Sequence, residues 1–184
     1  RFPGTLTLGA ETLVRVWTEI GDCVAAAGVR KLLLFNAHGG QVGLMDIVGR
    51  DLRARHDMIV YHSNWYDLPL ADAAMAPFSP AERRFGVHAG DIETSMMLAI
   101  RPAQVDMAQA RDFPSTSQQR AQDYPILGNG KSARLAWQMQ DYNPQGAAGN
   151  AAAATADKGD ALRASAGTQL ALLMAELSRL PRST

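Results

Sequence analysis

The chain has 184 residues, enough to bury a hydrophobic core without the support of disulfide bonds or a structural metal, and we expect one domain over residues 1–184. Hydrophobic residues make up 47% and charged residues 20%, which is typical of a folded globular protein and argues against disorder. The 18 basic and 18 acidic side chains give a formal net charge of 0, so no overall field attracts nucleic acid or an anionic membrane. We therefore expect no nucleic-acid partner and no membrane partner. No segment has the apolar length needed to span a bilayer, and a cytoplasmic location is the default expectation.

Two features near the start of the chain bear on completeness and redox chemistry. The sequence opens at Arg1 without Met and without a signal-peptide pattern, so we expect that an N-terminal part is missing. Cys23 is the only cysteine, which excludes an intrachain disulfide and a thiolate metal cluster. Its apolar neighbours predict a buried, inert thiol.

Helix and strand patterns alternate along the first 61 residues. Residues 10–28 repeat apolar side chains at three- and four-residue steps, which predicts an amphipathic helix that Gly28 ends. The apolar runs 31–36 and 58–61 predict strands buried on both faces, and the segment from Val42 to Leu52 between them predicts a second amphipathic helix. This alternation is typical of an α/β fold with a parallel sheet.

The second half of the chain has fewer regular patterns. Residues 76–87 contain Pro77, Pro80 and Gly86 and are expected to form a loop, whereas 91–100 predict a helix that stops before Pro102. The polar stretch 103–130 is expected to be a long surface excursion. The last helix is predicted over 156–180, with one apolar face formed by Leu162, Leu170, Leu173, Met174 and Leu177.

The segment Asn36-Ala37-His38-Gly39-Gly40-Gln41 is the first candidate for chemistry, because it leaves the carboxyl end of a buried strand, where α/β proteins place their sites. His38 is flanked by residues without bulk and could approach a metal or a substrate. Two alternatives remain open. The segment could be a glycine-rich turn whose His bonds to nearby backbone, or an anion cradle, although no P-loop lysine is present.

The segment His88-Ala89-Gly90-Asp91-Ile92-Glu93-Thr94-Ser95 is the second candidate. It places one imidazole and two carboxylates at the start of a helix, a donor set suited to a divalent cation. Helix capping alone would explain Asp91 but leaves His88 unexplained. Trp65, at the end of the second strand, could line a substrate pocket.

These two segments together resemble the creatininase family, whose members show Asn-Gly-His-Gly-Gly-Asn after a strand and His-Ala-Gly-Glu-x-Glu-Thr-Ser. A third family pattern is similar to Gly149-Asn150-Ala151, Ala154-Thr155 and Lys158-Gly159. The opening Phe2-Pro3-Gly4-Thr5-Leu6 is also similar to the family's chain before its long helix. The resemblance covers nearly all 184 residues.

The resemblance implies a single three-layer αβα domain with a mostly parallel sheet and a site for two divalent metal ions, Zn, Mn or Fe. A hydroxide bridging the metals would attack an amide carbon. By position, His38 and Glu93 resemble metal ligands, His88 the proton-shuttling histidine and Asp91 a second catalytic residue. Gly39, Gly40 and Trp65 are the expected substrate-binding residues. A homo-oligomer, possibly as large as a hexamer, is also implied.

Departures from the family pattern limit these expectations. Family members carry an earlier Glu-x-His…Asp ligand set, and no Glu-x-His occurs here. Creatinine is disfavoured as the substrate because creatinine amidohydrolase has Tyr and Glu where this chain has Gly39 and Gly40. We expect a metal-dependent hydrolase of a non-peptide or cyclic amide. The alternatives are a non-catalytic remnant or binding module and a phosphate-binding α/β protein.

Overall fold

The computed structural model describes residues 2 and 5–182, so Pro3 and Gly4 of the opening motif lie outside the described residues. Contacts divide the chain into two compact units. The first comprises Arg1–Leu70 and Ala166–Thr184, and the second comprises Ala71–Ser165. The expectation of one domain over residues 1–184 stays a prediction.

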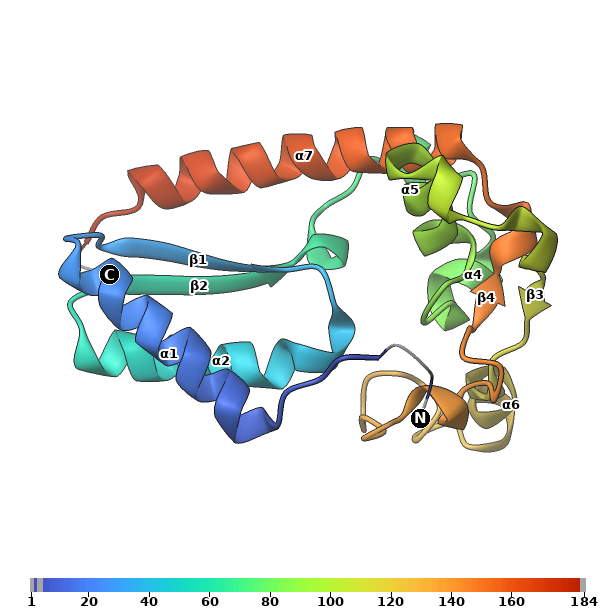
Figure 1. Ribbon diagram of the computed structural model, residues 1–184, viewed down its shortest axis with the longest axis horizontal. Coiled ribbons are helices and arrows are strands. Elements are labelled where there is room, and N and C mark those ends of the chain that lie inside the picture. Colours follow the sequence, from blue (N-terminus) through green and yellow to red (C-terminus); the bar gives the residue numbers. More distant parts are fainter. Residues whose placement is uncertain (1, 3–4, 183–184) are drawn as a thin grey trace. The chain divides into compact units, whose positions relative to one another are not determined.

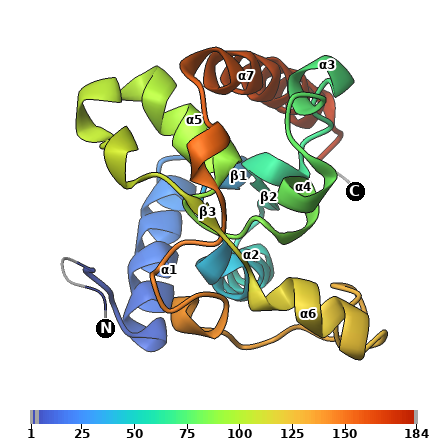
Figure 2. The ribbon, with the colours of Figure 1, turned by 90° about the vertical axis from the view of Figure 1, so that its right-hand side faces the viewer.

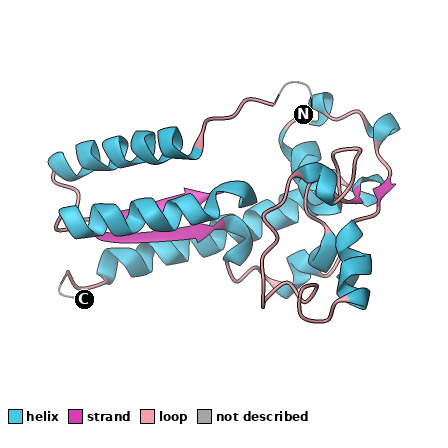
Figure 3. Cartoon of the chain, turned by 90° about the horizontal axis from the view of Figure 1, so that it is seen from below, coloured by secondary structure: helices cyan, strands magenta, loops and turns pink. Residues whose placement is uncertain are grey.

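The first unit is built around two parallel strands. Strand β1 (Lys31–Asn36) pairs with β2 (Ile59–Asn64), and the register runs from Lys31 opposite Ile59 to Asn36 opposite Asn64. Helix α2 (Val42–Arg55) packs against β2 and against α1 (Ala10–Ala26), while the C-terminal part of α7 (Ala156–Arg179) covers the opposite face (Figures 1 and 3). The predicted α/β fold with a parallel sheet is confirmed, and this unit has an αβα layering.

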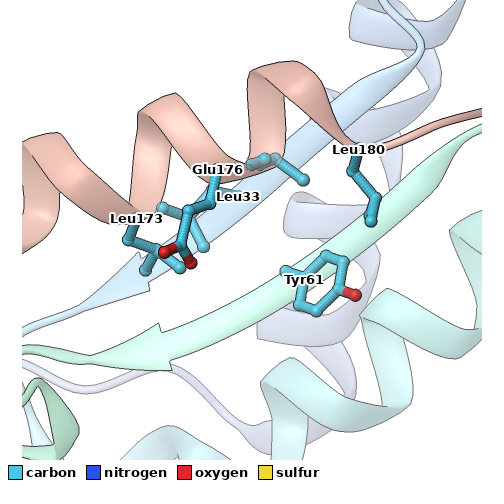
Figure 4. Close-up of a pocket in the computed structure, with 6 residues that line it drawn as sticks. Leu33, Tyr61, Leu173, Glu176 and Leu180 are labelled. Carbon is cyan, nitrogen blue, oxygen red and sulfur yellow. The ribbon is translucent and has the colours of Figure 1, made fainter.

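The contact between the sheet and α7 leaves one small hollow of about 140 Å³ (Figure 4). Leucine side chains dominate it because the helix turns an apolar stripe toward the strands. Its lining consists of Leu33, Tyr61, Leu173, Glu176, Leu177 and Leu180. The predicted apolar face of α7 is confirmed at Leu162 and Leu177, which are buried, but not at Met174, which is 53% exposed.

Several local expectations for this unit are borne out and others are wrong. Gly28 follows the end of α1 with a φ of +89°, a conformation that glycine adopts without a steric penalty. The strands are not buried on both faces, since Phe35 is 43% and Tyr61 48% exposed. The sheet described here has two strands, so each strand has only one neighbour. Cys23 is exposed rather than buried.

The second unit is mainly helical (Figure 2). Its core contains Phe78 and Leu162, both almost completely buried. The short strands β3 (Asp112–Phe113) and β4 (Gly149–Asn150) pair antiparallel. The elements of this unit before α7 are α3 (Asp72–Met75), α4 (Pro80–Phe85), α5 (Asp91–Ile100), β3 (Asp112–Phe113), α6 (Thr116–Asp123) and β4 (Gly149–Asn150).

Helix α5 has the predicted bounds, but the expected loop over 76–87 is wrong because it contains α4. Ser79 accepts a hydrogen bond from the Glu82 N–H and Pro80 occupies the first turn, which are ordinary signals for a helix start. The excursion 103–130 likewise contains β3 and α6. Single 3₁₀ turns occupy Gly39–Gln41, Trp65–Asp67, Pro102–Gln104, Met107–Gln109, Met139–Asp141 and Ala151–Ala153. None of the helices among residues 5–182 combines the length and apolar character that crossing a bilayer demands.

Candidate functional site

His38 lies just beyond β1 and precedes the 3₁₀ turn Gly39–Gln41. Its side chain is exposed at this edge of the sheet. A Cβ placed on Gly40 would lie 3.0 Å from the His38 Nε2, which is tighter than nearly all real contacts. Because Gly40 has no side chain, the His38 imidazole can occupy its observed position without a close contact.

The backbone of His38 is held by a buried asparagine that the sequence reasoning did not single out. Asn36 is 3% exposed. Its Nδ2 donates to the His38 carbonyl oxygen at 2.7 Å, and its Oδ1 accepts from the His38 N–H at 3.1 Å. The same Oδ1 accepts from Gln41 Nε2 at 2.9 Å. The loop that presents His38 is thus tied to the end of β1 on both sides of the residue.

A second buried asparagine supports the first from the neighbouring strand. Asn64 is 5% exposed and stands opposite Asn36 in the parallel register. Its Oδ1 accepts from Asn36 Nδ2 at 2.7 Å, and its own Nδ2 donates to Asp67 Oδ2 at 2.6 Å. The sequence shows only that each of these asparagines follows an apolar run. That the two form a pair becomes apparent only when the register of the strands is known.

Replacement of Asn64 tests whether this amide pair holds the loop. Asn64→Ala removes an acceptor from a buried amide, so we expect unfolding free energy to fall by about 1–3 kcal/mol. Ser63→Ala, at the preceding position, is the matched control and should cost no more than about 0.5 kcal/mol. Urea denaturation measures both. Equal losses in the two variants would show that the asparagine pair does not hold the loop.

Two predicted substrate-binding residues lie near one tyrosine. Trp65 is half-buried and meets Tyr66 edge-to-face, with ring centroids 5.8 Å apart. A Cβ on Gly39 would lie 3.5 Å from the Tyr66 hydroxyl. Gly39, Trp65 and Tyr66 therefore gather at the same edge of the sheet as His38. Their role toward a substrate stays a prediction.

In the second unit, His88 and Glu93 are in contact. The His88 Nδ1 lies 3.2 Å from Glu93 Oε2, and the two side chains are 50% and 41% exposed. Glu93 Oε2 also accepts the Ala89 N–H at 2.7 Å, so the carboxylate caps the segment before α5 as well as facing the imidazole. The structure thus brings an imidazole and a carboxylate together at this helix start, and capping accounts for part of the arrangement.

The backbone between these two side chains is unusual. Ala89 has a φ of +52°, the left-handed region that non-glycine residues adopt at a cost. A backbone bridge to Ala148 holds one side of the segment. The Ala148 N–H donates to the His88 carbonyl oxygen at 2.8 Å, and the Val87 N–H donates to the Ala148 carbonyl oxygen at 2.9 Å. Such strain persists only where the surroundings impose it, and it occurs most often at functional sites.

The Glu93 carboxylate raises the pKa of His88 above its ordinary value of 6.5, because it accepts a hydrogen bond from the imidazole, while burial opposes the shift. The stabilisation from this pair is therefore present below the ordinary pKa and is lost as pH rises through the raised value. We expect NMR titration of the metal-free chain to give a His88 pKa above 6.5 that falls in Glu93→Gln. An unchanged His88 pKa in that variant would contradict the pairing.

Asp91 is buried, at 3% exposure, and both of its oxygens are engaged. Lys158 Nζ lies 2.8 Å from Asp91 Oδ2, and Ser95 Oγ donates to Oδ1 at 3.1 Å. Lys158 also donates to the Ala153 carbonyl at 2.8 Å. These bonds join α5 to the start of α7, which is a structural task. The predicted catalytic role of Asp91 stays a prediction.

The donor chemistry fits a divalent metal in kind. Imidazole nitrogen and carboxylate oxygen from His38, His88 and Glu93 are ordinary ligands of zinc and manganese. Within the described part of the chain, however, no group of three or more His, Cys, Asp or Glu side chains is close enough to hold an ion. The convergence of His38 with Glu93 stays a prediction, since the two belong to different units.

Comparison with known proteins decides the family. The family model for creatininase, described as creatinine amidohydrolase, matches residues 1–174. The chain belongs to the creatininase family. The creatinine amidohydrolase of Pseudomonas putida is 33% identical over 122 residues, and the mycofactocin precursor peptide peptidase of Mycobacterium tuberculosis is 33% identical over 105 residues. These matches span 61% and 57% of this chain but only 46% and 35% of those relatives.

Solved structures agree with this membership. The crystal structure of a protein from Bacteroides fragilis assigned as a creatinine amidohydrolase has a TM-score of 0.77 and 26% identity, covering 98% of this chain and 67% of that one. A creatininase structure has a TM-score of 0.72 at 23% identity, covering 98% of this chain and 69% of that one, and shows the shared fold. Other creatininase structures of this fold are a Zn–Zn form and a manganese form.

Proposed function

We propose that the natural protein containing this chain is a metal-dependent hydrolase that cleaves a carbon–nitrogen bond in a non-peptide or cyclic amide. Membership of the creatininase family supports hydrolysis of an amide. The observation that carries the proposal within this chain is the contact between His88 and Glu93 at the start of α5, 3.2 Å apart and open to solvent. An imidazole and a carboxylate so placed can divide proton transfer and metal binding between them.

His38 and Glu93 are the proposed metal ligands, and we propose two divalent ions in the complete site, Zn, Mn or Fe. Zinc and manganese forms of creatininase structures with this fold support the divalent class. When bound, such ions activate water and polarise the amide carbonyl. The asparagine pair Asn36–Asn64 fixes the backbone of His38, which is what a ligand on a loop requires.

His88 is the proposed proton donor to the departing nitrogen. Its imidazole contacts Glu93, which orients the ring, and half of the side chain remains accessible. A donor must reach the leaving group directly, so this exposure suits the role better than it would suit a structural histidine. Asp91 is proposed only as a second site-lining acid, since its oxygens already bind Lys158 and Ser95.

The proposed substrate lies against the open edge formed by Gly39, Gly40 and Trp65. Gly40 leaves the His38 ring uncovered, and Tyr66 adds an aromatic edge beside Trp65. A compact cyclic or linear amide other than creatinine would suit this surface. A creatininase structure with creatine bound supports a small molecule as the substrate class. The expected homo-oligomer and cytoplasmic location stay predictions.

The proposal is tested by hydrolysis of a panel of small cyclic and linear amides by the natural protein. We expect turnover of at least one amide, its loss after chelation, and its return on addition of Zn²⁺ or Mn²⁺. Activity that survives exhaustive chelation would contradict a metal-dependent mechanism. A folded protein that binds no metal and cleaves no amide would favour the non-catalytic remnant.

A further inference from the structure

Glu82 is a buried carboxylate in α4 to which the proposed chemistry assigns no role. Glu82 is only 5% exposed. Oε1 accepts the Ile92 N–H at 3.2 Å, and Oε2 accepts the Asn150 N–H at 2.9 Å. No lysine, arginine or histidine among the described residues forms an ion pair with it. A buried carboxylate without a cation is costly, so its retention calls for a specific task.

The chain makes room for this carboxylate with glycines. A Cβ built on Gly86, Gly90 or Gly149 would lie within 3.0 Å of a Glu82 oxygen. The Cα atoms of Gly90 and Gly149 also approach each other, since a Cβ on either would clash with the other. The stretch from Glu82 to Gly90 and the segment around Gly149, which is far from it in sequence, therefore close around one side chain, and residues with a Cβ could not approach it so closely.

These segments carry His88 and Glu93, two of the proposed site residues of this unit. Ile92 directly precedes Glu93, and Gly90 is the N-cap of α5 that follows His88 and Ala89. On the other side, Asn150 stands two residues after Ala148, whose backbone forms a bridge with that of His88. Glu82 Oε1 thus binds the start of α5, which follows His88, and Oε2 binds β4, which follows Ala148. The bridge between His88 and Ala148 joins the same two segments.

We propose that Glu82 is a positioning residue that sets the spacing of His88 and Glu93 for metal binding and proton transfer. The inference rests on the proposed function. Two N–H donors at opposite ends of the carboxylate require two acceptor oxygens, which only an acidic side chain supplies. The negative charge also meets the positive end of α5 at its first turn. Both effects keep the α5 start and β4 at a fixed separation.

Glu82→Gln is the informative change, because it preserves size but turns one acceptor into an amide donor that faces another N–H. In the natural protein we expect Zn²⁺ affinity, measured by competition with a chromophoric chelator, to weaken about 10–100-fold, as for other residues that orient ligands. The catalytic constant kcat should fall as well, with KM changing less.

Ser79→Ala is the matched control, since Ser79 caps the same helix through the Glu82 N–H at 3.0 Å, whereas the Glu82 carboxylate binds the start of α5 and β4. We expect it to lower stability and leave Zn²⁺ affinity within about twofold of the parent, the size of ordinary surface effects. Glu82→Asp keeps two acceptors on a shorter stem and should fall between the two. If Glu82→Gln does not fold, the Zn²⁺ affinity of Glu82→Asp tests the positioning role in its place.

The outcomes separate the inference from the proposed function. Weaker Zn²⁺ binding in Glu82→Gln or Glu82→Asp, with normal binding in Ser79→Ala, supports the positioning role. Parental Zn²⁺ affinity in both Glu82 variants would overturn it and leave Glu82 as a fold residue, with the proposed function intact. Absence of Zn²⁺ binding by the parent protein would instead overturn the proposed function, and the inference with it.

Discussion

His38→Ala in the natural protein should reduce metal-supported amide hydrolysis to the level of the chelated parent. The imidazole is the one nitrogen ligand proposed from the His38 loop, and alanine offers no donor in its place. Folding should be little affected, because the side chain is exposed and Asn36 holds the loop through backbone atoms. We expect the unfolding free energy to change by less than about 0.5 kcal/mol.

His62→Ala is the matched control for this experiment. His62 is an exposed histidine of the same unit that lies within β2, and its Nε2 faces Asp46 at 3.5 Å rather than the loop that follows β1. We expect it to keep both metal and activity. Normal metal content and turnover in His38→Ala would show that His38 only contributes to a glycine-rich turn.

Glu93→Gln and His88→Ala should fail in different ways. Glutamine can still accept the Ala89 N–H, so the start of α5 should be kept, but a neutral amide is a poor ligand and metal should be lost with activity. His88→Ala should keep its metal and lower kcat by about 10²–10⁴-fold, the usual contribution of a general acid.

Metal analysis and turnover have to be measured on the same preparations of these two variants. Loss of metal in His88→Ala together with its retention in Glu93→Gln would reverse the two assignments. Parental values in both variants would favour the non-catalytic remnant. The two side chains are 3.2 Å apart, so the effects of replacing them need not add. We expect the double variant to bind as much metal as Glu93→Gln alone.

Local patterns predicted the regular elements well and short ones poorly. Helix α5 and strand β1 have the predicted bounds, since apolar periodicity and a following Pro102 or glycine-rich turn are local signals. Helix α4 was missed because it is only six residues long, begins with Pro80 and lies between Pro77 and Gly86, although Ser79-Pro80 is a recognisable helix start. Strand exposure could not be judged, since it depends on how many neighbours each strand finds.

Contacts among the candidate residues could be anticipated only where these residues are close in sequence. His88 and Glu93, which are in contact, are only five positions apart at a helix start. The Asn36–Asn64 pair depends on strand register, and the Asp91–Lys158 ion pair joins residues 67 positions apart. Buried polar groups find partners wherever the fold brings them, so these roles become visible only with tertiary structure.

Anomalous diffraction from crystals of the natural protein grown with Zn²⁺ or Mn²⁺ would locate the metal ions and show whether His38 and Glu93 bind them. We expect anomalous peaks at bonding distance, about 2.0–2.2 Å, from the His38 imidazole and from the Glu93 carboxylate. The His88 ring should approach without bonding the metal. Peaks bound only to other side chains, or crystals of active protein without any anomalous peak, would contradict the assignment of these ligands.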